Sequence, residues 1–152
     1  MNLKKSHYMG VDPGANGAIV IIDDSSTVVA GLRLSKSTEN DIWTFMTSNP
    51  CDFALLEKVH AMPKQGVSSS FKFGMAYGRL RAFLTASRIA WREATPQEWQ
   101  KGLSLTKGAE NSSQRKRDLK QLAEQRFPGE KIVLENADAY LIADYCRKTN
   151  WT

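Results

Sequence analysis

The sequence predicts an α/β fold in which a mixed five-stranded sheet, with three antiparallel strands followed by parallel strands, is flanked by helices. Three observations lead to this prediction. Short β-branched runs separated by tight turns fill the first third of the chain, one later run is apolar on both faces, and helical spacing of apolar residues dominates the second half. The 152 residues suit one domain, spanning residues 1–152.

Three apolar runs, at residues 7–11, 18–22 and 27–34, are the expected antiparallel strands. The segments between them, 13–17 and 23–26, are rich in the Gly, Pro, Asp and Ser residues that favour tight turns. Two tight turns between three such runs predict a meander of adjacent strands.

Parallel strands and helices are expected in the rest of the chain. Residues 53–56 are all apolar, which is typical of a strand buried on both faces, and residues 89–91 suggest a further short strand. Residues 101–110 are expected to form an exposed loop. Spacing and capping signals predict helices or helical turns at Glu39–Ser48 (after Thr38), Val67–Ala86, 95–99, 113–127 and 134–147.

Composition excludes some classes of protein. No apolar run approaches the ~20 residues of a membrane span, and the N-terminal segment lacks the apolar stretch of a secretory signal. Cys51 and Cys146 are expected to be reduced thiols in a cytoplasmic protein, and with two histidines they form no zinc motif. The net charge of +5 is compatible with nucleic-acid binding without establishing it.

Two acids lie three residues apart in the last expected helix, at Glu135 and Asp138. Asp138 falls on the apolar face that Ala137 and Leu141 mark, where an unpaired carboxylate is costly. Two neighbouring carboxylates also repel each other, and a divalent cation would relieve both penalties. The alternative, that Asp138 is partly exposed or bonded to a Lys or Arg, stays open at this stage.

Two further acids end expected central strands, Asp12 after residues 7–11 and Glu57 after residues 53–56. Each has a simpler interpretation alone, Asp12 as a turn residue and Glu57 as an ordinary charge at a strand end. Together with Glu135 and Asp138 they supply four carboxylates, which suit Mg²⁺ or Mn²⁺ rather than zinc. Two such ions, ~3.5–4 Å apart, can hold a phosphodiester and generate hydroxide.

Basic residues gather on two of the expected helices and in the loop between them. On a helix with an apolar opposite face, such a cluster favours phosphate binding, although a solvated basic face remains an alternative. The candidate DNA-binding residues are Lys72, Arg79, Lys107, Arg115, Lys116, Arg117 and Lys120.

Three segments resemble RuvC-type Holliday junction resolvases of the ribonuclease H-like superfamily. Residues 8–14 with Gly17 resemble the opening motif of that family, and Leu55-Leu56-Glu57 resembles its second acidic motif. Residues 135–139, with Leu141 and Ala143, resemble its C-terminal motif of two acids three apart. The resemblance covers roughly residues 7 to 148.

The resemblance implies a ribonuclease H-like fold and a homodimer with two active sites, one for each of two opposed strands of a four-way DNA junction. Cleavage would need Mg²⁺ or Mn²⁺, with two ions in each active site, and would leave nicks with 5′-phosphates. The resemblance also implies that Asp12 binds both ions, and that Glu57 and Asp138 each complete the coordination shell of one ion. Glu135 takes a position where relatives vary, and Lys116 approaches the scissile phosphate as a further catalytic residue.

The segment after the second acid departs from the cellular enzymes, which carry an aromatic wedge there. Residues 58–63 contain no Phe, Tyr or Trp, and the first such residues after Glu57 are Phe71 and Phe73. This stretch resembles phage or viral members, which would act in the host cytoplasm. The departure makes broader cutting of branched DNA an open possibility.

Three other functions are compatible with parts of the pattern. A nuclease on the same fold could act on flaps, forks or structured RNA, and a module of this fold could bind DNA without cutting it. A phosphate-binding lobe of the actin and sugar-kinase type also opens with a strand, an acid and a hairpin. The chain is too short for the two lobes of such a kinase and lacks a second Gly-rich loop.

Overall fold

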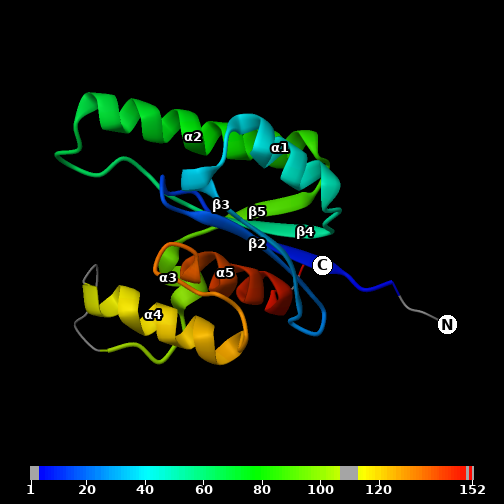
Figure 1. Ribbon diagram of the computed structural model, residues 1–152. Coiled ribbons are helices and arrows are strands. Elements are labelled where there is room, and N and C mark those ends of the chain that lie inside the picture. Colours follow the sequence, from blue (N-terminus) through cyan, green and yellow to red (C-terminus); the bar gives the residue numbers. More distant parts are fainter. Residues whose placement is uncertain (1–3, 107–112, 150, 152) are drawn as a thin grey trace.

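A mixed five-stranded sheet lies at the centre of the protein, as the computed structural model shows for residues 4–106, 113–149 and 151 (Figure 1). The strand order is β3-β2-β1-β4-β5, antiparallel among the first three and parallel among β1, β4 and β5. This confirms the predicted sheet. The strands are β1 (His7–Asp12), β2 (Ala18–Asp23), β3 (Val28–Arg33), β4 (Phe53–Glu57) and β5 (Ala90–Ala94).

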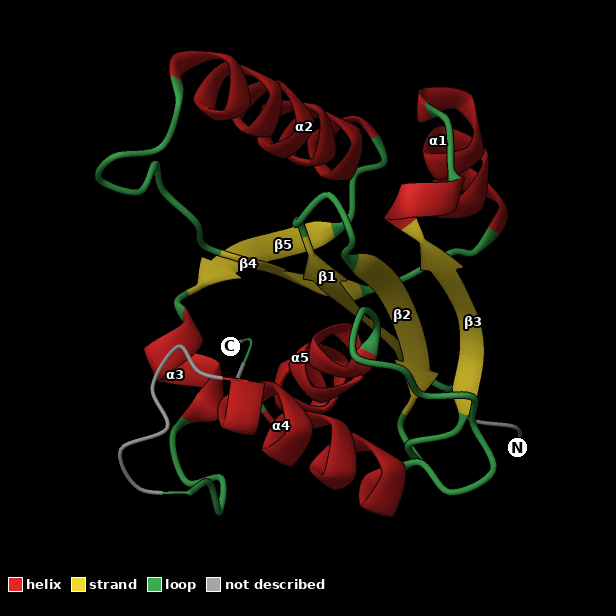
Figure 2. Cartoon of the chain, turned by 60° about the vertical axis from the view of Figure 1, so that its left-hand side comes forward, coloured by secondary structure: helices red, strands yellow, loops and turns green. Residues whose placement is uncertain are grey.

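Helices cover both faces of the sheet. Figures 1 and 2 show α1 and α2 on one face and α3, α4 and α5 on the other. This three-layer arrangement explains why β2, between two covered faces, is buried along its whole length. The helices are the short 3-10 helix η1 (Leu34–Lys36), α1 (Glu39–Ser48), α2 (Val67–Ala86), α3 (Pro96–Gln100), α4 (Ser113–Arg126) and α5 (Ala137–Lys148).

The sheet register brings the ends of three strands into one row. Asp12 pairs with Ala18, and Ala18 pairs with Arg33 on the next strand. On the other side of β1, the parallel pairing of Val11 with Leu56 puts Glu57 beside Asp12. The strand-end acids therefore meet at one edge of the sheet, as parallel strands require.

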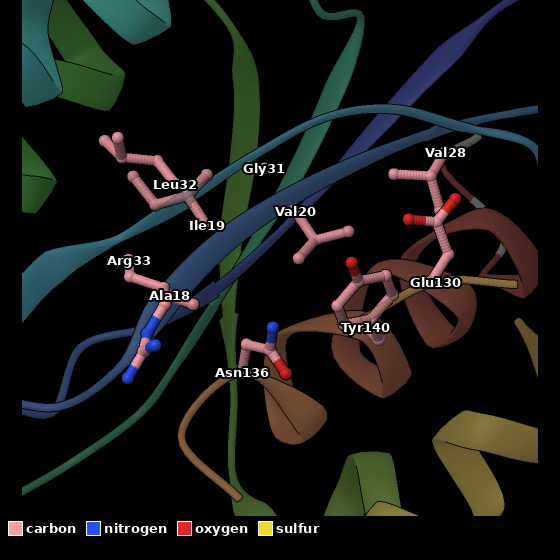
Figure 3. Close-up of a pocket in the computed structure, with 10 residues that line it drawn as sticks. All are labelled: Ala18, Ile19, Val20, Val28, Gly31, Leu32, Arg33, Glu130, Asn136 and Tyr140. Carbon is pink, nitrogen blue, oxygen red and sulfur yellow. The ribbon is translucent and has the colours of Figure 1, made fainter. Parts of the chain in front are cut away.

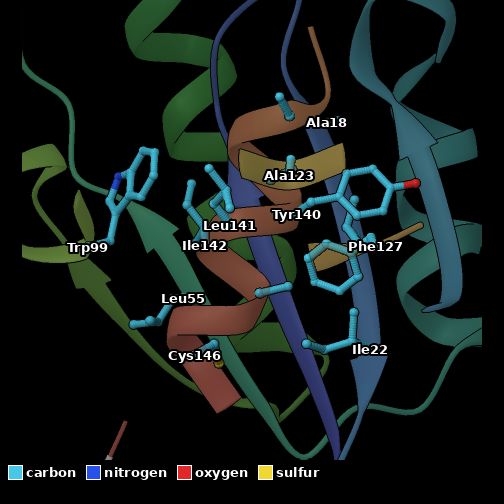
Figure 4. Close-up of a cluster of buried hydrophobic side chains, with 14 of the residues drawn as sticks. Ala18, Ile22, Leu55, Trp99, Ala123, Phe127, Tyr140, Leu141, Ile142 and Cys146 are labelled. Carbon is cyan, nitrogen blue, oxygen red and sulfur yellow. The ribbon is translucent and has the colours of Figure 1, made fainter. Parts of the chain in front are cut away.

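Alternate residues of each strand feed two separate cores. On the α5 side, Leu55, Trp99, Phe127 and Leu141 are buried together with the inner face of α5 (Figure 4). On the other side, the core combines side chains from the sheet, α1 and α2, and it contains Met9, Val11, Ile19, Leu56, Leu80 and Leu84. The period of two in the strands and the helical spacing in α2 produce this division directly.

Helix α5 packs tightly against β1 at Gly10. A β-carbon added there would lie 2.3 Å from the carbonyl oxygen of Ala139 and 2.3 Å from the amide nitrogen of Ala143. Because Gly10 has no side chain and the facing residues are alanines, the helix backbone rests directly on the strand. This contact fixes the height of α5 above the sheet.

Sequence signals located most helix starts correctly. Thr38 caps α1 and Thr95 caps α3, each in a capping box with the acid three residues later, Asp41 and Glu98. The helix predicted at Val67–Ala86 has those bounds, and the expected short strand at 89–91 is in fact Ala90–Ala94. Four residues were expected to face inward from this segment: Leu119, Ala123 and Phe127, which follows α4, are buried, and Leu122 is half-buried against the same core.

The last helix begins later than the sequence predicted, which is a correction. It starts at Ala137 rather than residue 134, so Leu134 and Glu135 lie in a turn, and Leu134 is 52% exposed rather than part of the apolar face. The Asn136 side chain explains the difference. Its amide oxygen accepts from Val133 N (2.8 Å) and its Nδ2 donates to the Lys131 carbonyl (3.1 Å). These backward bonds favour a turn over a further helical turn.

Helix α2 extends beyond the sheet at its N-terminal end, where Val67, Phe71 and Met75 are 88%, 68% and 58% exposed. Only its later part, with Leu80 and Leu84, is buried. In the described ranges, neither α2 nor any other helix is long and apolar enough to cross a membrane.

Both cysteines are free thiols, as expected. Burial raises the pKa of the Cys51 thiol to about 12 and also raises the pKa of Cys146. Neither thiol is therefore a ready nucleophile or metal ligand at neutral pH.

We expect Gly10→Ala to destabilise the protein by roughly 2–4 kcal/mol, because the added carbon collides with the α5 backbone rather than with a movable side chain. Urea denaturation measures the effect. The matched control is Gly31→Ala in β3, where the nearest atom to an added β-carbon is the Ile19 carbonyl oxygen at 3.8 Å, an ordinary contact. That substitution is expected to change the stability by no more than ~0.5 kcal/mol. Equal effects of the two substitutions would contradict the proposed role of Gly10.

Candidate active site

Three carboxylates from distant parts of the chain converge at the edge where β1 and β4 end. Asp12 and Glu57 are neighbours in the sheet register, and α5 brings Asp138 to the same place from above. The charge of Asp12 raises the pKa of both Glu57 and Asp138, and the charge of Asp138 raises that of Glu57. The structure therefore brings together three of the four acids that the sequence singled out.

Burial is the main cause of the perturbed pKa values in this cluster. It raises the pKa of Asp12, and with the repulsion between carboxylates it raises the pKa of Glu57 to about 8 and that of Asp138 to about 7. Charged groups of one sign held together away from water are unfavourable for folding. Such a group of acids is typical of a functional site, and a cation would relieve its repulsion.

Hydrogen bonds orient two of the acids. The Trp99 indole donates to Glu57 Oε2 at 2.7 Å, and the Gly14 amide donates to Asp12 Oδ1 at 3.2 Å. Both bonds favour the charged form and lower the pKa, which partly offsets burial. Trp99 is itself a buried core residue, and its bond to Glu57 had no sequence signal.

Lys116 faces the acids from α4. Its positive charge lowers the pKa of Asp12 and of Asp138, so the ammonium lies within electrostatic reach of both. The side chain belongs to an exposed residue and can also contact solvent or a ligand at this edge. That Lys116 contacts the reacting phosphate stays a prediction.

Glu135 does not join the other three acids. It lies in the turn before α5 rather than on the helix, and its carboxylate forms an ion pair with Arg33 at the end of β3. The expectation that Glu135 and Asp138 are neighbours on one helix is therefore wrong. The reason is the turn around Asn136, which separates Glu135 from the helical repeat.

The donor chemistry of the cluster fits a hard divalent cation. In the part of the chain that the structure describes, no three acidic, histidine or cysteine side chains are close enough to hold an ion as they stand. Repulsion between the carboxylates opposes closer approach until a cation neutralises them. Asp12, Glu57 and Asp138 would offer oxygen ligands alone, which suit Mg²⁺ or Mn²⁺.

Apart from Lys107, the predicted DNA-binding residues belong to α2 and α4, whose N-terminal ends flank the edge of the sheet where the acids meet (Figures 1 and 2). Lys72 is exposed on α2. Lys107 lies outside the described residues. The others have partners within the chain: Arg79 with Glu39 (2.9 Å), Arg115 with Gln100 (2.9 and 2.6 Å), Arg117 with Gln114 (2.9 Å) and Lys120 with Glu124.

Comparison with solved structures identifies the architecture. RuvC from Thermus thermophilus superposes with a TM-score of 0.65 at 11% sequence identity, over 91% of this chain and 92% of that chain. RuvC of the same organism in complex with a Holliday junction substrate gives a TM-score of 0.64 at 11% identity, over 91% of each chain. The chain has the RuvC fold.

The RuvC fold confirms the ribonuclease H-like α/β architecture expected from the sequence. At 11% identity the similarity shows the fold and leaves the activity to be argued from the site. Comparison with models of known protein families gave no match, and neither did comparison with curated proteins. Within the RuvC fold, the acids at the ends of β1 and β4 and at the start of α5 form the candidate active site.

We expect Glu57→Gln to make the metal-free protein less sensitive to alkaline pH. Because the folded-state pKa of about 8 lies above the ordinary value of 4.5, the stability from the protonated form is present below pH 4.5 and is lost as pH rises toward 8. The wild-type protein should therefore lose roughly 2–4 kcal/mol more than the variant between pH 4.5 and 9.

Urea denaturation in the presence of a chelator, repeated across this pH range, measures the difference. The glutamine amide keeps an oxygen that can accept from Trp99, so the variant changes the charge and preserves the hydrogen bond. If wild type and variant lose stability in parallel, Glu57 does not have the raised pKa described above.

Proposed function

We propose that the protein is a metal-dependent endonuclease that resolves four-way DNA junctions, cutting two opposed strands and leaving nicks with 5′-phosphates. The proposal rests chiefly on the convergence of Asp12, Glu57 and Asp138 in a buried, mutually repelling group. Such a group of carboxylates destabilises the fold, and binding of divalent ions would explain why the protein has it. The RuvC fold supports the choice of reaction, since a protein of that fold is known in complex with a Holliday junction substrate.

Each residue of the site has a distinct part in the proposed reaction. Asp12 lies between Glu57 and Asp138 and would be shared by two cations, while Glu57 and Asp138 would each hold one. When bound, Mg²⁺ or Mn²⁺ would supply activation of a water molecule and neutralisation of the phosphate charge. Trp99 holds the Glu57 carboxylate in orientation, and Lys116 would contact the scissile phosphate.

The DNA is proposed to lie across the edge of the sheet, between the N-terminal parts of α2 and α4. Lys72 belongs to α2 on one face of the sheet and Lys116 to α4 on the other, and Arg79, Arg115, Arg117 and Lys120 belong to the same two helices. Arg79, Arg117 and Lys120 would exchange their present side-chain partners for phosphate oxygens, which are stronger acceptors. Affinity should accordingly fall steeply with salt.

A homodimer is part of the proposal, because paired cutting needs two sites. The exposed apolar face of α2, formed by Val67, Phe71 and Met75, has the i, i+4, i+8 spacing of a face that packs against another helix. Gly74 and Gly78, on the same helix, have open space above them and would allow close approach of a second backbone. We propose that these residues contribute to the dimer interface.

A second candidate keeps the site and changes the substrate to flaps, replication forks or structured RNA. The segment between β4 and α2 favours it, because residues 58–66 contain no aromatic side chain that could open a junction. The same observation underlies the proposal that the protein is of the phage or viral type, acting in the cytoplasm. A module that binds DNA without cutting is disfavoured by the three intact acids.

We expect Asp12→Asn and Asp138→Asn each to lower the rate of junction cleavage by well over ~100-fold, because each removes the charge of a cation ligand without changing its shape. Junction binding, measured by gel shift in Ca²⁺, should stay within about threefold of wild type. The matched control is Asp24→Asn in the turn between β2 and β3, at the other end of β1, which should cut normally. Undiminished cleavage by either site variant would refute the assignment.

The substrate is tested with a panel of end-labelled four-way junctions, three-way junctions, flaps and RNA hairpins in Mg²⁺. We expect the four-way junction to be cut fastest, with nicks placed symmetrically on two opposed strands, because two sites of one dimer act together. Faster cutting of flaps or RNA, or nicks on one strand only, would favour the second candidate.

A further inference from the structure

Arg33 belongs to the same row of the sheet as the strand-end acids. It pairs with Ala18, which pairs with Asp12, so its backbone lies two strands, or roughly 10 Å, from that of Asp12. Residues in one row of a sheet direct their side chains to the same face. Because Ala18 is part of the core beneath α5, the Arg33 side chain leaves the sheet on the side where α5 carries Asp138.

The partner of Arg33 is Glu135, the fourth predicted acid. Their side chains are 33% and 39% exposed, so water screens part of their attraction. Arg33 Nη2 contacts Glu135 Oε2, while Arg33 Nε is a buried atom without a hydrogen-bond partner in the described ranges. The ion pair therefore leaves one donor of Arg33 unused, and a divalent cation, which carries more charge, could replace Arg33 at this carboxylate.

The surroundings allow such an exchange. Arg33 lines a cavity of about 260 Å³ between β2, β3 and the start of α5, which gives its side chain room to move (Figure 3). The turn that carries Glu135 is fixed separately, through the two side-chain bonds of Asn136. Glu135 can therefore change partner without loss of the turn.

We propose that Arg33 is a positioning residue that withholds Glu135 from the other three acids, and that a divalent cation competes with Arg33 for this carboxylate. This inference rests on the proposed function, because it takes the acids as cation ligands. Arg33 and Lys116 then differ in their effect. Lys116 balances the charge of Asp12 and Asp138, whereas Arg33 occupies a ligand that the cation needs.

Removing the charge of Arg33 should tighten cation binding. Titration of metal-free protein with Mn²⁺ alone, followed by calorimetry without DNA, is expected to give a dissociation constant about three- to tenfold lower for Arg33→Met than for wild type. Arg33→Lys keeps the charge and should remain within about twofold. The matched control is Arg81→Met, which breaks the Arg81–Glu93 ion pair on the α2 side and should leave Mn²⁺ affinity unchanged.

A double-mutant comparison separates this competition from a general effect of charge. In a Glu135→Gln background, Arg33→Met should change Mn²⁺ affinity by less than about twofold, because the contested carboxylate is gone. An equal gain in Mn²⁺ affinity in both backgrounds would overturn the proposal, because Arg33 would then act only through the long-range effect of its charge. Failure of the proposed function gives a different result: wild type and Asp12→Asn would bind Mn²⁺ equally weakly.

Discussion

The direct contact between α5 and β1 at Gly10 is the constraint on which the rest of the site depends. It allows a helix backbone to rest on a strand backbone, with Ala139 and Ala143 as the facing residues. Asp138 precedes Ala139, so the same contact brings its carboxylate toward the end of β1, where Asp12 is. A larger residue at position 10 would lift the helix and separate the acids, even if the fold survived.

The geometry that gathers the acids also opposes folding. Three carboxylates are moved out of water and toward one another, and the raised pKa values of Glu57 and Asp138 measure this cost. The indole of Trp99 and the ammonium of Lys116 reduce it without removing it. The two cores on either side of the sheet must supply the remaining stability, which is common where a site requires an unfavourable arrangement.

Positive charge is distributed unevenly around the acids. Lys116 acts on Asp12 and Asp138, while Arg33 is paired with Glu135 in the turn before α5. Helices α2 and α4, which carry the predicted basic residues, have their N-terminal ends beside the same edge of the sheet. An anionic polymer would meet positive charge at the periphery and acids in the middle. This arrangement suits a phosphodiester that arrives with cations.

The sequence by itself determined the strands, most helix boundaries and three of the four acids of the candidate site, the three that the structure brings together. The apolar runs of β1 and β2, the capping box at Thr38 and the acids that end β1 and β4 are local features, and local propensity decides them. Only the tertiary structure decided the ion pair of Arg33 with Glu135 and the bond from Trp99 to Glu57. Each depends on a side chain meeting a group outside its own repeat, and the periodicity of a single segment holds no information about such a partner.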